Sequence, residues 1–199
     1  FLISEALKDI LHTELSIGRV DLGYFNRIIL DDVRIKDQKK KDLLKAARLS
    51  AKIELTSLLH GKISISNVQL YGFDIRLYQR TQKEKPNFQF LIDTFAKKDS
   101  LPSNPNLRIN SVLIRRGKLS WHRYDKSPTP GRFNPDHIVL DKISATLSLK
   151  SYTADSLNLN VKNFSFEEHS GLQLKQLSFK ITANREKAQL DHFTIELPH

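Results

Sequence analysis

The chain has 199 residues, of which 39% are hydrophobic and 27% charged, and 32 Lys and Arg against 22 Asp and Glu give a formal net charge of +10. This composition is typical of a soluble globular protein that is long enough to bury a core, and it excludes a disordered chain. Cysteine is absent, which excludes disulfides, a thiol nucleophile and cysteine metal sites.

No run of the sequence approaches the roughly 20 consecutive apolar residues that a membrane-spanning helix needs. The chain begins at Phe1 and contains no methionine, so we interpret it as a piece of a longer polypeptide. The positive charge favours contact with phosphate, either on nucleic acid or on anionic lipid headgroups. A solubilising surface would need the same charge and is the alternative interpretation.

Two segments show the three- and four-residue spacing of an amphipathic helix. The first covers residues 2–14, where Ile3, Leu7 and Ile10 share one face. The second covers residues 87–97, where Phe88, Leu91 and other apolar residues share a face and Pro86 precedes the segment. The sequence therefore predicts two short amphipathic helices.

The remainder alternates with a period of two, which is typical of strands with one buried and one solvated face. Eight segments share the finer pattern apolar–x–apolar–x–x–apolar–x–apolar. Their central pairs are all non-apolar: Gly18-Arg19, Asp31-Asp32, Ser66-Asn67, Asn110-Ser111, Asp141-Lys142, Lys162-Asn163, Lys175-Gln176 and Asp191-His192.

An uncompensated slip of one residue would send all later side chains of a strand to the other face of the sheet. A β-bulge at each central pair absorbs the extra residue, keeps the apolar set on one side and bends the strand. A tight turn at each pair, giving many short hairpins, is the alternative. We therefore predict a mainly β (α+β) fold: a curved antiparallel sheet of repeated bulged strands with the two short helices.

The seven prolines lie outside all eight copies of the pattern, as expected if these copies are strands. They mark loops at about residues 99–106 and 122–136. We expect one continuous β-rich domain over residues 1–199, with a helix-bearing half, 1–98, and a purely stranded half, 107–199.

Motifs for catalysis are missing from the sequence. No two histidines have the spacing of a helical zinc pair, and we find no nucleophile elbow, phosphate-binding glycine loop or dinucleotide fingerprint. The acidic pair Asp31-Asp32 falls where the strand pattern requires polar residues, and His122, Tyr124 and Asp125 fall in a proline-rich loop. We therefore expect a non-enzymatic protein without catalytic, cofactor-binding or metal-binding residues.

The order of the segments gives a more specific indication. An amphipathic helix leads into LSIGRVDL at 15–22, IILDDVRIKD at 28–37, ARLSAKIEL at 47–55 and LLHGKISISNVQLYGFDIRL at 58–77. This order resembles the opening of AsmA/TamB-like proteins over roughly residues 10–95, and the segment PNFQFL at 86–91 is also similar to envelope members of that family. The later half shares only the strand pattern.

The resemblance implies a periplasmic protein that is anchored in the inner membrane through a segment absent from this chain. It also implies a role in phospholipid transport between the inner and outer membranes, or in outer-membrane biogenesis, by analogy with bridge-like lipid transfer proteins whose bent sheets form an apolar trough. The implied partners are lipid acyl chains, an anionic membrane surface or outer-membrane assembly proteins.

Within the family-like region, the clearest strand offers Ile63, Ile65, Val68 and Leu70 as the lining of a lipid groove. The alternative, favoured for much of the surface in a chain this short, is that the same face forms a closed core packed under the two helices. Two other classes of function remain open. One is an assembly or scaffold module that handles outer-membrane β-barrel chains, and the other is a module that binds nucleic acid or an anionic surface.

Overall fold

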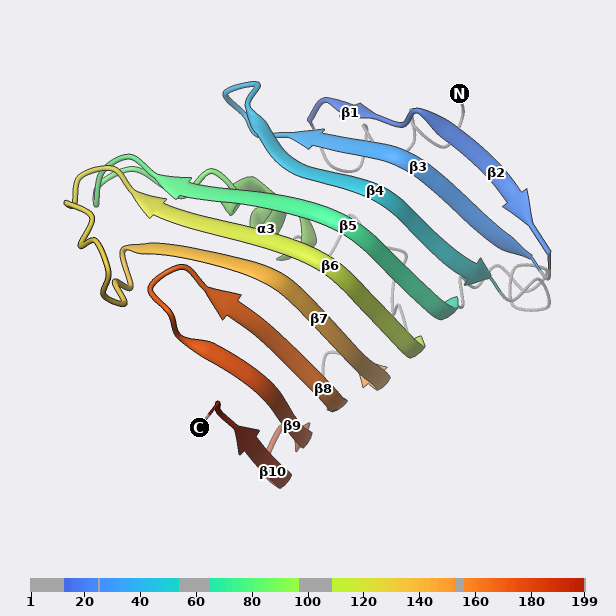
Figure 1. Cartoon of the computed structure of the whole chain (residues 1–199). Helices are drawn as coiled ribbons and strands as arrows, with labels where there is room; N and C mark the ends of the chain where they lie inside the picture. The colour runs from blue at the N-terminus through green and yellow to red at the C-terminus, as the bar shows by residue number, and fades with distance from the viewer. Residues whose placement is uncertain (1–12, 25, 54–64, 97–108, 153–155, 199) are drawn as a thin grey trace.

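The computed structural model describes residues 13–24, 26–53, 65–96, 109–152 and 156–198. They form one bent and twisted sheet of ten strands (Figure 1). The strands are β1 (Leu15–Ser16), β2 (Arg19–Gly23), β3 (Arg27–Lys36), β4 (Asp42–Ile53), β5 (Ile65–Gln79), β6 (Ile109–Arg123), β7 (His137–Tyr152), β8 (Ser156–Glu168), β9 (Gln173–Asn184) and β10 (Ala188–Glu196).

The strands from β3 to β10 lie side by side in chain order, and both β1 and β2 pair with β3. The prediction of a mainly β sheet is therefore confirmed, but the expectation that it is antiparallel throughout needs one correction. β5 and β6 run parallel, with Asn67 opposite Ser111 and Gln79 opposite Arg123. A parallel pair needs a crossover connection, and the chain between these two strands contains a helix.

That helix is α3 (Gln89–Ala96), which lies within the predicted range 87–97. It begins just after Pro86 and Asn87, and Gln89 N donates a hydrogen bond to Pro86 O at 3.0 Å. The expectation of two helices is not borne out, because α3 is the single helix among the described residues. Residues 1–12 of the other predicted helix lie outside the described residues, and Thr13 and Glu14 are not helical.

The predicted bulges are present at six of the eight central pairs. At each of them the strand has one residue more than its neighbour where the register shifts, and at least one residue of the pair lies in that stretch. The six pairs are Ser66-Asn67, Asn110-Ser111, Asp141-Lys142, Lys162-Asn163, Lys175-Gln176 and Asp191-His192. Seven of the eight pairs lie inside a continuous strand, so the hairpin alternative is wrong.

At the remaining two pairs, Gly18-Arg19 and Asp31-Asp32, the strand is not interrupted by a bulge of this kind. Asp32 in β3 has a left-handed backbone, with φ of 53°, yet the register with β4 does not change across it. Gly18 lies between β1 and β2, where its N–H reaches Asp31 O at 3.0 Å. Lys142 and His192 share the left-handed conformation of Asp32, with φ of 52° and 53°. The bends therefore use local backbone conformations that non-glycine residues rarely adopt.

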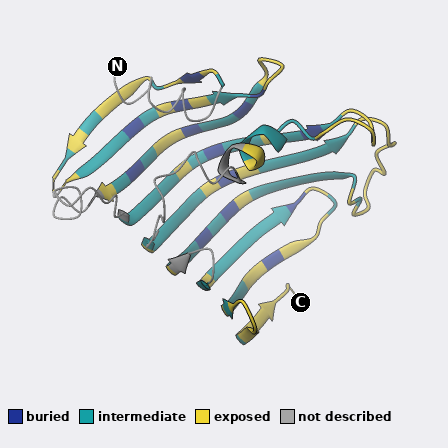
Figure 2. Cartoon of the chain, turned by 180° about the vertical axis from the view of Figure 1, so that it is seen from behind, coloured by how far each residue is buried: buried dark blue, intermediate teal, exposed yellow. Residues whose placement is uncertain are grey.

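The hydrophobic core lies on one face of the sheet, which we call the apolar face. Its buried centre consists of Leu15, Leu30, Val33, Ala46, Phe73 and Ile143. The Phe88 ring, just before α3, contacts Trp121 of β6 edge-on at 6.2 Å between centroids. Trp121 has the apolar phase of β6, so α3 lies over the apolar face, which is the side turned toward the viewer in Figure 2.

Candidate apolar ligand surface

A row of small and large residues crosses the middle of the apolar face from β3 to β7. Val33 lies opposite Ala46, and Ala46 lies opposite Phe73. Gly117 of β6 lies opposite Ile143 of β7. Four of these five strands therefore present a buried core residue in this row, and β6 presents Gly117. The bends in the strands keep the apolar residues in phase.

Phe73 connects the two halves of this row. Its side chain is 5% exposed, and its ring covers the backbone of Gly117 so closely that a Cβ at Gly117 would overlap the ring carbons. A glycine inside a strand often marks such a close approach of a neighbouring group. The aromatic ring thus replaces the side chain that β6 lacks at this position.

Burial on the apolar face declines toward the last strand. Ile143 of β7 is 5% exposed, and Val161 of β8 and Leu174 of β9 are each 7% exposed. On β10, however, Leu190 and Phe193 are 56% and 57% exposed. The outer edge of β10 has no strand partner among the described residues, so these side chains are covered from one side only.

The described part of the sheet is thinly covered. Among the described residues, no large side chain is less than 2% exposed. In this part of the chain the strands form a single layer with one short helix across it, and not two packed layers.

The predicted groove residues fall on this face as far as they can be placed. Val68 and Leu70 are half-buried, and they lie opposite Ala51 and Leu49 of β4. Leu70 packs against the buried core cluster. Ile63 lies outside the described residues, and so does the side chain of Ile65, although its backbone begins β5.

A buried carboxylate that the sequence pattern does not predict stabilises the connection between β3 and β4. Asp37 is 3% exposed and accepts hydrogen bonds from the Tyr78 hydroxyl at 2.7 Å and from the backbone N–H groups of Lys39 and Lys41 at 2.8 and 2.9 Å. Asn87 Nδ2 approaches the same carboxylate at 3.4 Å, so this group also ties down the segment before α3. An aspartate that accepts a hydrogen bond from the backbone two residues on is typical of turns, but the long-range partners of Asp37 could not be inferred from this local preference.

Two ionisations are shifted by this arrangement. Burial alone would raise the pKa of Asp37, but the hydrogen bonds from Lys41, Tyr78, Lys39 and Asn87 together lower the pKa below its usual value. Burial and the hydrogen bond to Asp37 raise the pKa of Tyr78 to about 12. The pair is therefore a neutral phenol that donates to a stable carboxylate.

The opposite, polar face carries a cavity of about 770 Å³ whose lining includes Arg19, Asp31, Arg48 and Tyr71. Asp31 forms ion pairs with Arg19 at 2.7 Å and with Arg48 at 2.6 Å. The hydrogen bond from Arg48 lowers the pKa of Asp31, with a further contribution from Arg19. A carboxylate held ionised between two guanidinium groups is a poor proton donor or acceptor, so we interpret Asp31 as a structural ion-pair partner of the two arginines.

Within the described ranges, no group of three or more His, Asp or Glu side chains is placed to hold a metal ion. No helix in the same part of the chain is both long and apolar enough to cross a bilayer. Comparison of the sequence with models of protein families and with curated proteins finds no match.

Proposed function

We propose that the chain belongs to an AsmA/TamB-like envelope protein and that its apolar face carries lipid acyl chains during phospholipid transport between the inner and outer membranes. The observation that supports this proposal best is the continuous apolar face of the sheet, which is a single layer of strands among the described residues. On β10, Leu190, Phe193 and Ile195 are each more than half exposed. The proposed role is non-enzymatic, and the proposed location is the periplasm, with an inner-membrane anchor outside this chain.

The dimensions of the face suit such a ligand. Strands β3 to β10 are neighbours in one sheet, and at a spacing of about 4.8 Å they span about 34 Å. This length is comparable to the roughly 30 Å of a bilayer's hydrocarbon core. Each methylene removed from water would contribute about 0.8 kcal/mol, so an acyl chain could be held without specific polar contacts.

The test compares lysine substitutions on the two faces of one strand. Phe193→Lys places a charge on the apolar face of β10, and Thr194→Lys places the same charge on the adjacent residue, whose side chain points to the other face. Because Phe193 is 57% exposed, both variants should fold, as thermal melts would show. We expect F193K to bind a fluorescent phospholipid at least tenfold more weakly and T194K to bind it like the wild type.

Val68→Lys extends the test to the region of the predicted groove. If Val68 lines an open groove, the charge can reach water, the protein folds and acyl-chain binding weakens. If Val68 belongs to a closed core, V68K unfolds because a buried charge is left unpaired. Lipid-free wild-type protein by mass spectrometry, together with an unfolded V68K, would refute carriage at this segment.

A further inference from the structure

Three connections meet at one end of the sheet, and we call them together the loop end. They are residues 37–41 between β3 and β4, residues 80–88 after β5, and residues 124–136 between β6 and β7 (Figure 1). Lys39 Nζ forms an ion pair with Glu84 at 3.0 Å, which joins the first loop to the second. Gln82 N donates to Asp125 at 3.0 Å, which joins the second to the third.

The loop end is rich in positive charge. Its cations are Lys39, Lys40, Lys41, Arg80, Lys83, Lys85, Lys126 and Arg132, and its acids are Asp37, Glu84, Asp125 and Asp136. The excess of eight cations over four acids is part of the overall +10. Charge is therefore concentrated here by the fold, although the sequence distributes it over three separate segments.

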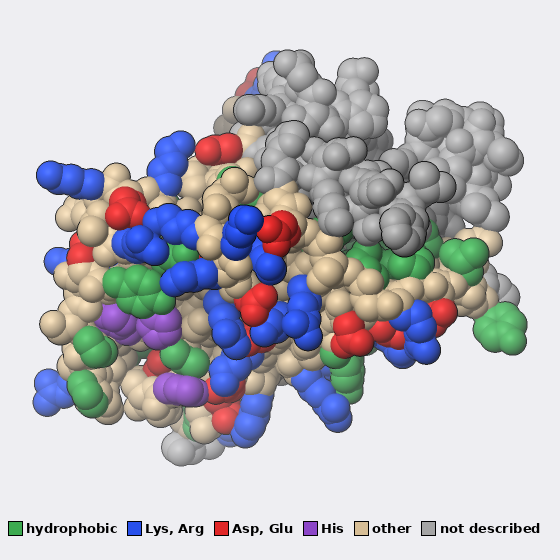
Figure 3. All heavy atoms as spheres, turned by 90° about the horizontal axis from the view of Figure 1, so that it is seen from above, with side chains coloured by type: hydrophobic (Ala, Val, Ile, Leu, Met, Phe, Trp, Pro, Cys, Tyr) green, Lys and Arg blue, Asp and Glu red, His purple; other side chains and the backbone are tan. Residues whose placement is uncertain are grey.

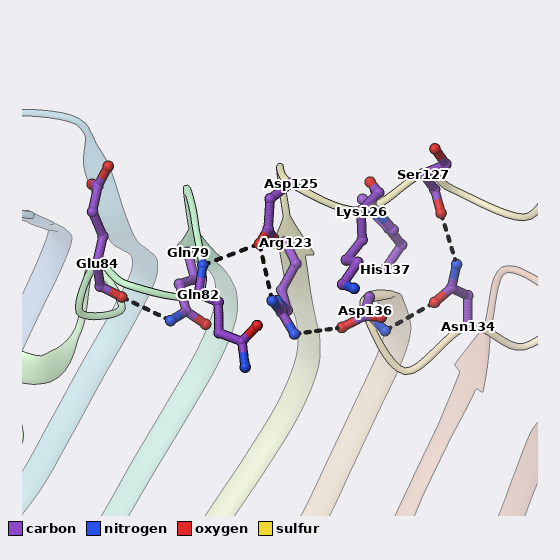
Figure 4. Close-up of polar contacts among 10 residues, drawn as sticks. All are labelled: Gln79, Gln82, Glu84, Arg123, Asp125, Lys126, Ser127, Asn134, Asp136 and His137. Carbon is purple, nitrogen blue, oxygen red and sulfur yellow. Dashed lines mark hydrogen bonds and ion pairs between the residues drawn. The ribbon is translucent and has the colours of Figure 1, made fainter.

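The acids of the loop end have internal partners, whereas several cations do not. Asp37 is buried, and Arg123 lies between Asp125 at 3.1 Å and Asp136 at 3.3 Å (Figure 4). Four cations, in contrast, are exposed and form no ion pair within the described part of the chain: Arg80, Lys83, Lys126 and Arg132. The exposed charges of the loop end that form no ion pair within the described part of the chain are thus all positive.

The third loop is well fixed although it is exposed. Asn134 Nδ2 donates to Ser127 O at 3.2 Å and to Thr129 Oγ1 at 3.1 Å, and the Asn134 side chain accepts a hydrogen bond from Asp136 N at 2.9 Å. His137 Nε2 lies 2.8 Å from Lys126 O. Figure 4 shows the contacts of Asn134 with Ser127 and Asp136.

This loop nevertheless leaves two aromatic residues in solvent. Phe133 is 52% exposed, and Tyr124, at the beginning of the loop, is 59% exposed. In the space-filling view, hydrophobic and histidine side chains gather at the left end of the molecule, and Lys and Arg side chains lie around them (Figure 3). A fixed loop that holds an aromatic ring outward has little conformational entropy to lose on binding.

We propose that the loop end docks onto a bilayer surface containing anionic phospholipid, with Phe133 entering the interface and Arg80, Lys83, Lys126 and Arg132 facing the headgroups. Aromatic rings favour the interfacial region of a membrane, and each nearby cation adds to the attraction of an anionic leaflet. The four cations thus suit the anionic headgroups, and the Phe133 ring suits the interfacial region beneath them.

Nucleic acid is the competing partner for a basic surface with aromatic residues. Binding of single strands uses successive aromatic faces along a basic groove. At the loop end, Tyr124 already stacks against His122, with ring centroids 6.5 Å apart, and lies 5.5 Å from the Tyr78 ring. Only Phe133 is then left as a free ring, which suits insertion into a membrane better than stacking along a strand of bases.

The biological purpose of this docking rests on the proposed lipid carriage, for which it names the membrane contact, but the binding itself is measured separately. Sedimentation would use vesicles of phosphatidylcholine alone and vesicles that also contain phosphatidylglycerol. We expect binding to the anionic vesicles that weakens with added salt, and little binding to the neutral ones.

Matched variants locate the contact. Phe133→Ser and Lys126→Glu should each weaken binding to anionic vesicles at least fivefold. The controls are Tyr24→Ser and Lys187→Glu, which change a 91% exposed aromatic residue and an exposed cation at the opposite end of the sheet. Both controls should bind like the wild type, and melting curves would confirm that all the variants fold.

Equal weakening by the control variants would overturn the proposal, because the attraction would then come from net charge alone. Tight, salt-sensitive binding of an oligonucleotide that F133S leaves unchanged, with no binding to vesicles, would also overturn it in favour of nucleic acid. If F193K abolishes phospholipid binding in solution while vesicle docking persists, the two surfaces are separate. If docking persists and the wild type binds no phospholipid, lipid carriage fails and the docking surface stands.

Discussion

Replacing Tyr78 by phenylalanine tests whether the buried carboxylate of Asp37 stabilises the fold. The variant removes a 2.7 Å hydrogen bond to a side chain that is 3% exposed, and it keeps the ring, which is 7% exposed. A hydrogen bond to a charged group contributes about 1.5–3 kcal/mol. Because Asp37 retains its bonds from Lys39 and Lys41, we expect Y78F to lower the free energy of unfolding by about 1.5–2 kcal/mol.

The pH dependence of this difference gives a sharper result. The pKa of Tyr78 is raised to about 12 in the folded protein, from an ordinary value of 10.0. A raised folded pKa means that the unfolded chain loses its phenolic proton first. The stabilisation is therefore complete below pH 10, and it declines as the pH rises from 10 to 12.

Urea unfolding of the wild type and Y78F at pH 8 and at several values up to pH 11.5 measures both effects. The lysines also titrate in this range, but they do so in both proteins, so only the difference between the two is interpreted. We expect the difference to shrink steadily above pH 10. A difference under 0.5 kcal/mol at pH 8, or one that stays constant up to pH 11.5, would refute the argument.

Three further predictions concern the core, the bends and the buried carboxylate of Asp37. Gly117→Ala should destabilise the protein by about 1–3 kcal/mol in urea unfolding, because its Cβ would overlap the Phe73 ring, and G117A should cost less in a Phe73→Leu background. Lys142→Gly should be tolerated at φ of 52°, Lys142→Val should cost about 1–2 kcal/mol, and deletion of Lys142 should prevent folding by shifting Leu140 to the polar face. Finally, the hydrogen bonds to Asp37 outweigh its burial and lower its pKa in the folded protein. The contribution of this carboxylate to the free energy of unfolding should therefore be complete above about pH 4 and decrease below it. The loss of stability below about pH 4 in urea unfolding should be smaller in Asp37→Asn.

The strands and their bends could be predicted because both follow from local patterns. A period of two identifies a strand with one apolar face, and the extra residue at pairs such as Asp141-Lys142 can be accommodated only by a bulge if that face is to remain apolar. The direction of β6 could not be predicted in this way. It depends on how the chain from residue 80 to residue 108 crosses the sheet, and the alternation of apolar residues is the same for parallel and antiparallel neighbours.

The apolar face could also be predicted from the sequence only in part, and the Asp37–Tyr78 contact could not be predicted from it. The apolar face followed from the pattern, and Val68 and Leu70 lie on it, but their exposure depends on what covers the sheet, which is a property of the tertiary structure. The Asp37–Tyr78 contact joins residues 41 positions apart. A sequence pattern of local period contains no information about such a pair.

The bulges also explain how one sheet can offer two different surfaces. In β6, Trp121 lies on the apolar face and contacts Phe88, whereas the neighbouring His122 lies on the other face and stacks against Tyr124 of the loop end. This division holds at the end of a strand of 15 residues only because the bulge at Asn110-Ser111 and the left-handed Arg116, with φ of 55°, keep the apolar residues in phase along its length. A strand without them would mix apolar and polar residues on both faces beyond the first bend. The same local backbone feature therefore keeps the proposed acyl-chain surface apolar and places the aromatic and basic side chains at the loop end.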